Sequence, residues 1–276
     1  MAFTNGVQVI GHRGSPKLKP ENTMISMEMA LNEGAKAIEF DVAMTKDGVA
    51  ILLHDDTLDR TTNFTGSLKD FSLRDLKTCD FGVKFRKKSG DESVGFVGVT
   101  TLEQVIQWAL KHNIKMIFDI KHTHLEMVSL IDSVFQKYGL YDAAVASSLY
   151  PTVVYHIKRR NPRILTSFAW CRWTYAYHDL HAKIPCYLRA NVSTWSLNAW
   201  CAITWLPYFL GVDFILVERA FASEAYVRHN ETCGRGVIVW SVNDEHEALW
   251  VNKILNIPFI TDYPGRTIAA IRKTGV

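Results

Sequence analysis

Short apolar runs rich in β-branched residues alternate along this chain with stretches of helical spacing. Such alternation predicts an α/β fold in which helices connect parallel strands. The sequence contains nine candidate strands, so one of them must pair irregularly or lie outside an eight-stranded barrel. The connection from Asp41 to Val49 is suspect, because Thr45–Gly48 form a turn too short to hold a crossover helix. The candidates are residues 7–11, 37–42, 49–54, 115–120, 143–147, 164–169, 213–217, 236–242 and 257–261.

Helix signals lie between these strands. Pro20 and the Glu-Asn-Thr that follows it open one helix, which Gly34 ends. Thr101 opens another helix, with Gln104 three residues later completing a capping box. A third helix is expected over residues 125–138. The helices therefore fall where a parallel barrel needs its connections.

Length and charge limit the organisation and the partners. With 276 residues and 48% hydrophobic content, the chain can form one large domain over residues 1–276, or at most two small ones. Residues 56–100 are polar and weakly periodic, so we expect a small insertion there, after the third strand. A net charge of +3 leaves no strong basic stripe, which argues against a nucleic-acid partner.

Two features bear on membrane association. The first residues contain neither the basic nor the apolar region of a signal peptide, so the chain is either cytoplasmic or lacks a leader that relatives carry. Residues 195–217 are nearly all apolar, but a transmembrane helix needs about 20 residues and the uninterrupted part, 199–212, is shorter. This segment is either a buried helix leading into strand 213–217 or a membrane-contacting patch beside the site. Its aromatic and proline content slightly favours membrane contact.

Two histidines, His12 and His54, each end an apolar run and each precede a charged residue. In a parallel barrel the strand ends converge on one mouth, so the two side chains are expected to meet there. Histidine titrates near neutrality and can act as a general acid or a general base. A single histidine at a strand end is more often structural, whereas two in this setting favour a catalytic pair. The other eight histidines lack the setting.

Three carboxylates share the geometry of these strand ends. Glu39 and Asp41 are two apart on one strand, so both side chains point to the same face. Asp119 ends the strand at 115–120 in the same way. Unpaired carboxylates would repel one another, and a divalent cation relieves the repulsion. An all-oxygen ligand set predicts Mg²⁺ or Ca²⁺ rather than zinc.

Two cationic side chains stand beside these groups. Arg13 follows His12, and Lys121 shares the face of Asp119. We expect both to bind a phosphate, with Arg13 in bidentate fashion, although a salt bridge between Lys121 and Asp119 is the simpler alternative. Asp55 either orients an imidazole or contacts the metal through water. Together these residues predict a metal-dependent phosphodiester hydrolase.

Weaker candidates surround the predicted mouth. Glu21 and Asn22 either contact substrate hydroxyls or phosphate, or simply start their helix. Trp240 ends a late strand and forms either the floor of the pocket or part of the core. Asp262 is assigned to structure, and Arg60 to the ion pairs of its loop.

These motifs, in order along the chain, resemble the glycerophosphodiester phosphodiesterase family. The resemblance spans roughly residues 7–265 and is closest to the animal membrane-associated branch, where the third ligand is Asp, as at Asp119. The matching pieces are His12-Arg13-Gly14, Pro20-Glu21-Asn22-Thr23, Glu39-x-Asp41, Thr45-Lys46-Asp47-Gly48, His54-Asp55, Asp119-x-Lys121, Trp240-x-Val242-Asn243 and Thr261-Asp262.

The resemblance implies a TIM (β/α)8 barrel and hydrolysis of glycerophosphodiesters to glycerol 3-phosphate and an alcohol. It implies His12 and His54 as acid and base, with attack by the substrate's own 2-hydroxyl. Glu39, Asp41 and Asp119 would hold the cation. Arg13 and Lys121 would hold the phosphate; these seven residues are carried over position by position.

The same branch implies a membrane-associated glycoprotein with a lumenal or extracellular site. Three N-x-S/T sequons, at Asn63, Asn191 and Asn230, agree with that location, but a cytoplasmic chain would not use them. A lysophospholipase D acting on lysophospholipids or N-acyl lysophospholipids is the nearest alternative, since the 195–217 segment could hold an acyl chain. A non-catalytic membrane-associated barrel is a further alternative, which the complete set of site residues disfavours.

Overall fold

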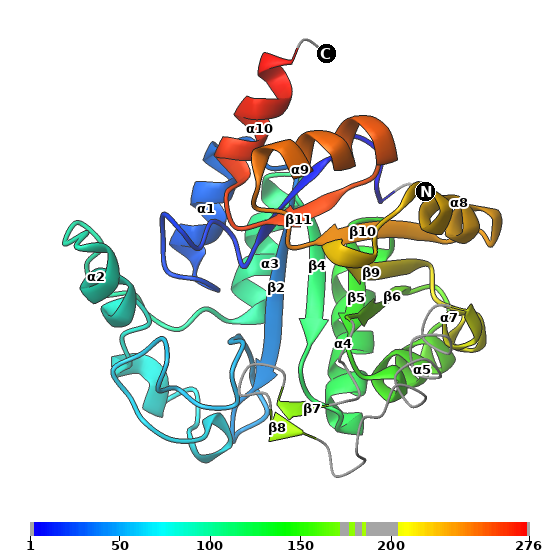
Figure 1. The fold of residues 1–276 in the computed structure, drawn as a ribbon. Helices are drawn as coiled ribbons and strands as arrows, with labels where there is room; N and C mark the ends of the chain where they lie inside the picture. Colours follow the sequence, from blue (N-terminus) through cyan, green and yellow to red (C-terminus); the bar gives the residue numbers. More distant parts are fainter. Residues whose placement is uncertain (1–2, 172–176, 180–183, 186–203, 275–276) are drawn as a thin grey trace.

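The computed structural model describes residues 3–171, 177–179, 184–185 and 204–274. Within these residues eight parallel strands close into a barrel in the order β1-β2-β4-β5-β6-β9-β10-β11, with β11 pairing back to β1 (Figure 1). The α/β barrel predicted from the sequence is confirmed. Short β7 and β8 pair with each other outside the barrel.

The strands are β1 (Val9–His12), β2 (Ala37–Met44), β3 (Ala50–Leu52), β4 (Lys115–Ile120), β5 (Ala144–Ser148), β6 (Leu165–Trp170), β7 (Tyr177–Asp179), β8 (Ile184–Pro185), β9 (Phe214–Glu218), β10 (Gly236–Trp240) and β11 (Phe259–Thr261). The α-helices are α1 (Met24–Asn32), α2 (Val83–Ser89), α3 (Leu102–Lys111), α4 (Leu125–Tyr138), α5 (Pro151–Arg160), α7 (Leu206–Leu210), α8 (Glu224–Thr232), α9 (Glu245–Trp250) and α10 (Pro264–Lys273). Shorter helical turns are η1 (Leu68–Asp70), η2 (Asp75–Thr78), η3 (Leu140–Asp142), η5 (Arg219–Phe221) and η6 (Val251–Leu255).

The ninth candidate strand, β3, lies outside the ring. It pairs antiparallel with the end of β2, with Val42 opposite Leu52 and Met44 opposite Ala50. The turn between them is closed by Thr45, whose hydroxyl donates to Val49 O at 3.1 Å. The short connection therefore forces a hairpin, as the sequence predicts.

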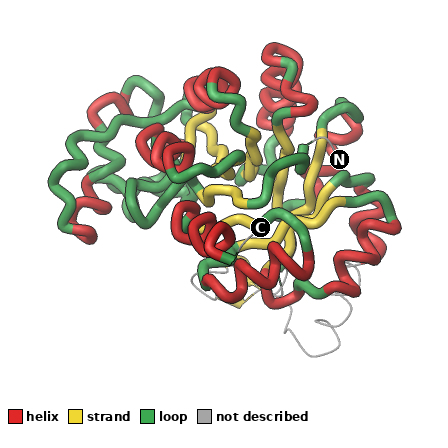
Figure 2. The backbone as a smooth tube through the Cα atoms, turned by 90° about the horizontal axis from the view of Figure 1, so that it is seen from above, coloured by secondary structure: helices red, strands yellow, loops and turns green. Residues whose placement is uncertain are grey.

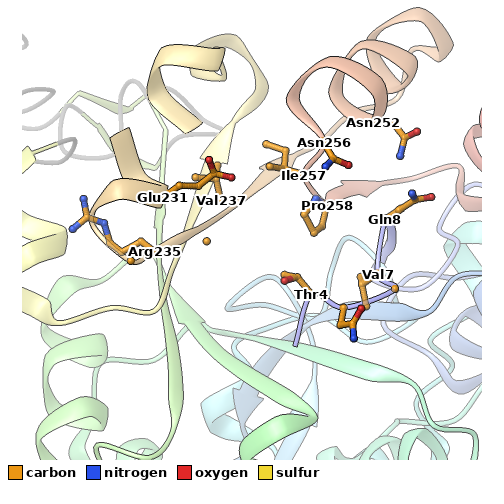
Figure 3. A pocket seen from close by; sticks show the side chains of 14 residues that line it. Thr4, Val7, Gln8, Glu231, Arg235, Val237, Asn252, Asn256, Ile257 and Pro258 are labelled. Carbon is orange, nitrogen blue, oxygen red and sulfur yellow. The ribbon is translucent and has the colours of Figure 1, made fainter. Parts of the chain in front are cut away.

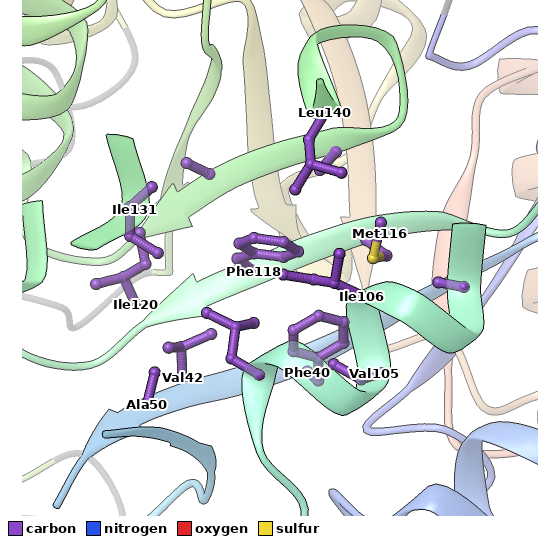
Figure 4. Close-up of a cluster of buried hydrophobic side chains, with 14 of the residues drawn as sticks. Phe40, Val42, Ala50, Val105, Ile106, Met116, Phe118, Ile120, Ile131 and Leu140 are labelled. Carbon is purple, nitrogen blue, oxygen red and sulfur yellow. The ribbon is translucent and has the colours of Figure 1, made fainter. Parts of the chain in front are cut away.

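Alternation along each strand separates two apolar layers. Every second side chain of a strand points into the barrel, where Ile10, Ile117 and Ile238 belong to one buried cluster. The intervening side chains, such as Phe40 and Phe118, pack outward against the helices (Figure 4). Helices surround the strands when the barrel is viewed from above (Figure 2). Polar side chains on the inward-pointing positions therefore face the barrel axis.

The helix predictions hold closely. Thr101 forms the predicted capping box with Gln104 at the start of α3. The third predicted helix, α4, covers 125–138 and ends at Gly139, whose φ of +63° suits glycine. At α1 the cap residue is Thr23, but its hydroxyl donates to Pro20 O at 2.6 Å instead of capping the helix.

The segment between β3 and α3 forms a separate lobe beside the barrel, at the left of Figure 1. It contains η1, η2 and α2 and has its own buried cluster, which includes Leu58, Leu68, Leu76 and Phe81. Ile51 of β3 belongs to the same cluster, so the lobe is joined to the barrel through the hairpin. Its first residues directly follow His54.

The apolar segment 195–217 is described only from residue 204 onward. In this part Pro207 and Leu210 of α7 are buried, whereas Trp205, Tyr208 and Phe209 are exposed. The chain then enters β9. In the described part of the chain, no helix combines the length and apolar character needed to cross a membrane.

A cavity of about 1240 Å³ opens at the amino-terminal ends of β1 and β10. Its lining mixes apolar and polar residues, and the polar ones include Gln8, Arg235, Asn252 and Asn256 (Figure 3). Parallel barrels build their active sites at the opposite, carboxyl-terminal end. This cavity is therefore separate from the site residues predicted above.

Candidate active site

The predicted site residues meet at the carboxyl-terminal end of the barrel. Glu39, Asp41 and Asp119 lie on inward-facing positions of β2 and β4, and the strand register places Asp41 beside Asp119. The register of β1 and β2 places His12 beside Glu39. Residues that are far apart in the chain thus become neighbours because parallel strands end at the same edge.

The turn after β1 requires its two glycines. A Cβ on Gly14, whose φ is +88°, would lie 2.5 Å from Ser26 of α1, and a Cβ on Gly11 would lie 2.5 Å from Gly14 O. Both contacts are too close for any larger residue. The tight turn brings the backbone N–H of Arg13 to Glu39, donating to Oε2 at 3.1 Å.

The three carboxylates form one cluster. A ligand oxygen from each of Glu39, Asp41 and Asp119 lies within 4.8 Å of the other two. Asp119 Oδ1 is buried and has no hydrogen-bond partner among the described residues. A buried carboxylate oxygen without a donor is costly, and hard oxygen donors suit Mg²⁺ or Ca²⁺. The cluster therefore fits a divalent cation.

Burial and neighbouring charges give the carboxylates of this cluster different pKa values. Burial, together with the charge of Asp41, raises the pKa of Glu39 to about 7. Burial acts on Asp41 in the same direction, but Arg13 and Lys121 outweigh it and hold the pKa of Asp41 well below its ordinary value. Asp41 is therefore ionised at neutral pH, whereas Glu39 in the metal-free protein still binds a proton there part of the time.

Arg13 and Lys121 are ion-paired inside the cluster. Lys121 Nζ lies 2.6 Å from Asp119 Oδ2 and 2.9 Å from Asp41 Oδ1, so the predicted alternative of a salt bridge is present. Arg13 Nε lies 3.0 Å from Asp41 Oδ2, although without hydrogen-bond geometry. When all three carboxylates are ionised, they and the two cationic side chains together carry one net negative charge. A bound divalent cation would make the net charge of the site positive and so favour an anionic substrate.

Both histidines direct the same ring nitrogen at a carboxylate. His12 Nδ1 lies 2.6 Å from Asp262 Oδ1, and His54 Nδ1 lies 2.6 Å from Asp55 Oδ1. A carboxylate at Nδ1 favours a proton on that atom, so Nε2 carries the lone pair of the neutral ring. Burial lowers the pKa of His54, while Asp55 opposes the shift. His54 is thus held in its neutral form, which can accept a proton.

Asp262, which the sequence interpretation assigned to structure, contacts His12. Its second oxygen, Oδ2, accepts from Asn243 Nδ2 at 3.0 Å, and Lys17 Nζ lies 3.6 Å away. The only sequence signal for this contact was its position just after β11, at the same end as the other site residues. The contact with His12 depends on β1 lying next to β11, which closure of the ring establishes.

Arg60 makes more contacts than a loop ion pair would. It donates to both oxygens of Glu21, at 2.8 and 2.7 Å, and through Nε to Asp55 at 2.5 Å. Glu21 also accepts from Arg13 NH1 at 2.8 Å. The lobe therefore supplies a guanidinium that connects the carboxylate behind His54 to the one beside Arg13.

The remaining candidates differ in what they can contact. Asn22 is 3% exposed, and its amide donates to Asp41 Oδ2 at 2.7 Å and accepts from Asp41 N at 3.2 Å. Asn22 thus supports Asp41, and both of its side-chain polar atoms are engaged there. Trp240 packs on the barrel-interior cluster, and its Nε1 is buried without a partner among the described residues.

In enzymes with a parallel α/β barrel the active site lies at the carboxyl ends of the strands, and this chain carries its cluster of polar groups at that end. The model of the family described as "Glycerophosphoryl diester phosphodiesterase family" matches residues 12–266. The chain therefore belongs to this family and is a phosphoric diester hydrolase, which confirms the enzyme predicted from the sequence.

Similar proteins come from animals and bacteria. Human "Glycerophosphodiester phosphodiesterase 1" is 28% identical over 267 residues, covering 93% of this chain and 78% of that protein. "Probable glycerophosphodiester phosphodiesterase 1" of Mycobacterium tuberculosis is 28% identical over 275 residues, covering 95% of this chain and 91% of the relative. A phosphodiesterase from Oleispira antarctica, solved with its product sn-glycerol-3-phosphate, is 24% identical, with a TM-score of 0.76 over 98% of this chain and 99% of its own. That last likeness supports the fold.

Proposed function

We propose that this enzyme hydrolyses glycerophosphodiesters, such as the glycerophosphoinositol, glycerophosphocholine or glycerophosphoethanolamine types, to glycerol 3-phosphate and an alcohol. The observation that carries the proposal is the arrangement of the two histidines. His12 lies beside Glu39 and His54 interacts electrostatically with Asp41, so the pair flanks the carboxylate cluster. The Oleispira relative was solved with glycerol 3-phosphate as its product, which supports the same product here.

Glu39, Asp41 and Asp119 are the residues we propose to hold one divalent cation, Mg²⁺ or Ca²⁺. When bound, the cation supplies charge neutralisation at a phosphoryl oxygen. Asn22 keeps Asp41 in place through two hydrogen bonds. The support for this assignment is the close approach of the three carboxylates and the unpartnered oxygen of Asp119.

Arg13 and Lys121 are proposed to bind the phosphate. Although burial opposes the charged forms, the neighbouring carboxylates raise the pKa of both side chains above their ordinary values. Both therefore stay cationic throughout the pH range of catalysis. Glu21 holds one edge of the Arg13 guanidinium and so orients the rest of it.

His12 and His54 are proposed to move the protons. One imidazole accepts the proton of the substrate's 2-hydroxyl as that oxygen attacks phosphorus. The bond from phosphorus to the alcohol breaks, and the other imidazole protonates the leaving alkoxide. The products are the alcohol and a cyclic phosphodiester. Water then opens the ring with the proton roles reversed, which yields glycerol 3-phosphate.

A panel assay tests the proposal. The protein is incubated with glycerophosphocholine, glycerophosphoinositol or glycerophosphoethanolamine in Mg²⁺ or Ca²⁺, and products are followed by phosphorus NMR. We expect glycerol 3-phosphate and loss of activity in excess EDTA. Full activity of His12→Ala, or full activity in EDTA, would contradict the proposed mechanism.

A lysophospholipase D activity is the second candidate. The observation that favours it is the exposed aromatic surface of α7, where Phe209 stacks on Trp205 at 5.2 Å and on Tyr155 at 5.7 Å between ring centroids. Acylated and deacylated substrates compared on detergent micelles separate the two activities. If Trp205→Ala with Phe209→Ala leaves turnover of the acylated substrate unchanged, this surface does not serve acyl substrates.

Contact with a membrane surface is proposed at the same aromatic surface. Tyr208 is 80% exposed, and aromatic side chains with polar edges suit a membrane interface. Flotation with liposomes tests the contact, and an unchanged bound fraction in Tyr208→Ser would contradict it. A lumenal or extracellular site is part of the same proposal.

The N-x-S/T sequons differ in how well they support a lumenal or extracellular site. The side chain of Asn230 is fully buried, donating to Tyr226 O at 2.9 Å and accepting from Arg235 Nε at 3.0 Å. A glycan cannot be attached there in the folded protein. Asn63 is exposed, and Asn191 lies outside the described residues. Of the described sequons, Asn63 is therefore the one to test by glycosidase treatment.

A further inference from the structure

A second cavity lies at the carboxyl-terminal end of the barrel, where three separate segments of the chain meet. These segments are the β2–β3 turn, the first part of the lobe, and the loop between β4 and α4 together with the start of that helix. The volume of the cavity is about 380 Å³, near the lower end of the range for small-molecule sites. The lining residues are Met44, Thr45, Lys46, Asp56, Ser67, Leu68, Lys69, His122, His124 and Met127.

The charged side chains of this cavity are mostly cationic. Lys46 and Lys69 line it together with a single carboxylate, Asp56. His122 and His124 line it too and add positive charge when they are protonated. Two ammonium groups against one carboxylate repel a metal cation and attract an anion. The lining therefore favours an anionic ligand.

The two lysines differ from the lysines that form ion pairs within the fold. Lys19 lies 3.2 Å from a carboxylate oxygen of its partner, and Lys121 lies 2.6 Å from its own. Among the described residues, neither Lys46 nor Lys69 has a carboxylate oxygen within 4.0 Å. Asp75 acts on Lys46 electrostatically, but from beyond that distance. Both ammonium groups, which belong to exposed residues, are therefore available to a ligand.

The two imidazoles lie next to each other at the cavity. The rings of His122 and His124 are 6.5 Å apart between centroids, with 24° between their planes. Burial lowers the pKa of His122 and His124 lowers it further, whereas Asp56 opposes the shift. Two protonated rings repel each other in the empty cavity, and a bound anion would offset that repulsion. The pair can therefore donate hydrogen bonds to an anion more readily than to a neutral ligand.

The apolar part of the lining indicates that the anion carries a carbon skeleton. Met44, Leu68 and Met127 line the cavity beside the cationic groups. Their side chains would contact the carbon atoms of a ligand, while the two lysines and the imidazoles would contact its charged oxygens. Several cationic donors match a phosphate dianion better than a carboxylate, which has one charge. The small volume favours a phosphorylated polyol over a nucleotide.

The cavity is adjacent to the active site in the chain but does not share its residues. Asp56 comes two residues after His54, and His122 directly follows Lys121. The backbone oxygen of Asp56 accepts from Leu68 N at 2.9 Å, so the segment after His54 is tied to another part of the same lining. No lining residue is among those proposed to move protons, hold the metal or bind the substrate's phosphate. Binding in the cavity can therefore be measured separately from catalysis.

We propose that this cavity is a second anion site, which binds the phosphomonoester group of a small polyol phosphate. The ligand is either free in solution, as glycerol 3-phosphate is, or forms the head group of a phosphoinositide lipid. Both sources present the same chemistry, a phosphate dianion on a short hydroxylated skeleton. Lys46 and Lys69 bind the phosphate, and the ligand connects the β2–β3 turn with the lobe.

The experiment counts binding sites by calorimetric titration with glycerol 3-phosphate. Wild type is compared with a cavity variant, Lys46→Gln with Lys69→Gln, and with a control variant, Lys84→Gln with Lys88→Gln. The control removes the same charge from exposed positions of α2 in the same lobe. kcat/KM for glycerophosphocholine is measured for all three proteins without added phosphate.

We expect wild type to bind two equivalents of glycerol 3-phosphate, one at the active site and one in the cavity. The cavity variant should keep the first and bind the second at least about tenfold more weakly, the usual effect of removing a charged hydrogen-bond partner. Its kcat/KM should stay within about twofold of wild type, as for other surface substitutions. The control variant should keep both equivalents.

Cosedimentation with vesicles distinguishes the two sources of the phosphate. Phosphatidylcholine vesicles contain either phosphatidylinositol 4-phosphate or, at matched charge, phosphatidylserine. Stronger binding of wild type to the first kind, lost in the cavity variant, would assign the site to a lipid head group. Equal binding to both kinds, together with the calorimetric result above, would assign it to a free polyol phosphate.

Two calorimetric results would overturn the inference. One is an unchanged number of sites and unchanged affinity in the cavity variant, and the other is an equal loss in the control variant. Failure of the proposed function gives a different result. In that case glycerol 3-phosphate is not released from any diester of the panel, whereas loss of binding in the cavity variant alone would still support the second anion site.

Discussion

The two histidines are held in matching ways by different parts of the molecule. Each presents Nδ1 to a carboxylate oxygen at 2.6 Å. The carboxylate behind His12 is Asp262, which follows the last barrel strand and is 250 residues away in the chain. The carboxylate behind His54 is its immediate neighbour Asp55, which the lobe residue Arg60 holds in turn.

The same contact between a histidine and a carboxylate therefore arises in two different ways in this fold. The His12 pair depends on closure of the barrel, because β1 and β11 must be adjacent before Asp262 can reach the ring. The His54 pair is local and depends on the lobe only for support. Changes to the barrel should therefore affect the first pair, and changes to the lobe should affect the second.

The largest effect is expected from removing either imidazole. His12→Ala and His54→Ala should each lower kcat about 10²- to 10⁴-fold, since each removes one proton-transfer group. The exposed His112, at the end of α3, provides the control, and His112→Ala should keep full activity. If only one of the two variants lost activity, the two histidines would not both transfer a proton in the reaction.

The next largest effect is on the pH dependence of stability, because the carboxylates beside the two histidines have different pKa values. The folded pKa of Glu39, about 7, lies above its ordinary 4.5, so the folded protein binds more protons than the unfolded chain between these values. The stability of the metal-free protein should therefore fall as pH rises through this window, by roughly 3 kcal/mol in total. Asp41 has a lowered pKa, so its contribution is already complete above pH 3.8 and adds no slope there.

Denaturant unfolding in EDTA from pH 4.5 to 7.5 measures this slope. Other groups also contribute to the pH dependence of unfolding, so the informative quantity is the difference between wild type and Glu39→Gln. We expect the variant to lose the part of the slope that Glu39 contributes. An identical pH dependence in both proteins would contradict the raised pKa.

Replacing the supporting carboxylates should have a smaller effect. Asp262→Asn and Asp55→Asn should each lower kcat about 10- to 100-fold, the usual cost of removing a histidine's hydrogen-bonded partner. We expect the larger loss at Asp262, because it is the more buried of the two and its hydrogen bond is less screened by water. The reverse order in kcat would mean that the local pair dominates catalysis.

The smallest effect is expected at Arg60. Without its guanidinium, Glu21 would pair fully with Arg13, so Arg60→Ala should raise KM by less than tenfold; we estimate about threefold, as for a partly exposed ion pair. Arg60→Lys should restore little, because an ammonium cannot form the same two-pronged contact. Arg86→Ala, which breaks the lobe's own pair with Asp80, is the control and should leave KM unchanged.

Much of the fold follows from local signals in the sequence. The strand positions, the hairpin at Thr45–Gly48 and the Thr101 cap all depend on residues within a few positions of one another. The same holds for the His54–Asp55 contact and for the pairing of Glu39 with Asp41 on one face of β2. Strand period and turn length act over such short spans, so a single sequence is enough to predict them.

The tertiary structure decided the contacts between distant strands. The contact of Asp262 with His12 requires ring closure, and the contact of Arg60 with Glu21 requires the lobe to place Arg60 next to the loop before α1. Local sequence thus determined which chemical groups reach the mouth of the barrel. The closed geometry decided which of them support one another, because the first and last strands become neighbours only after every strand between them in the chain has paired.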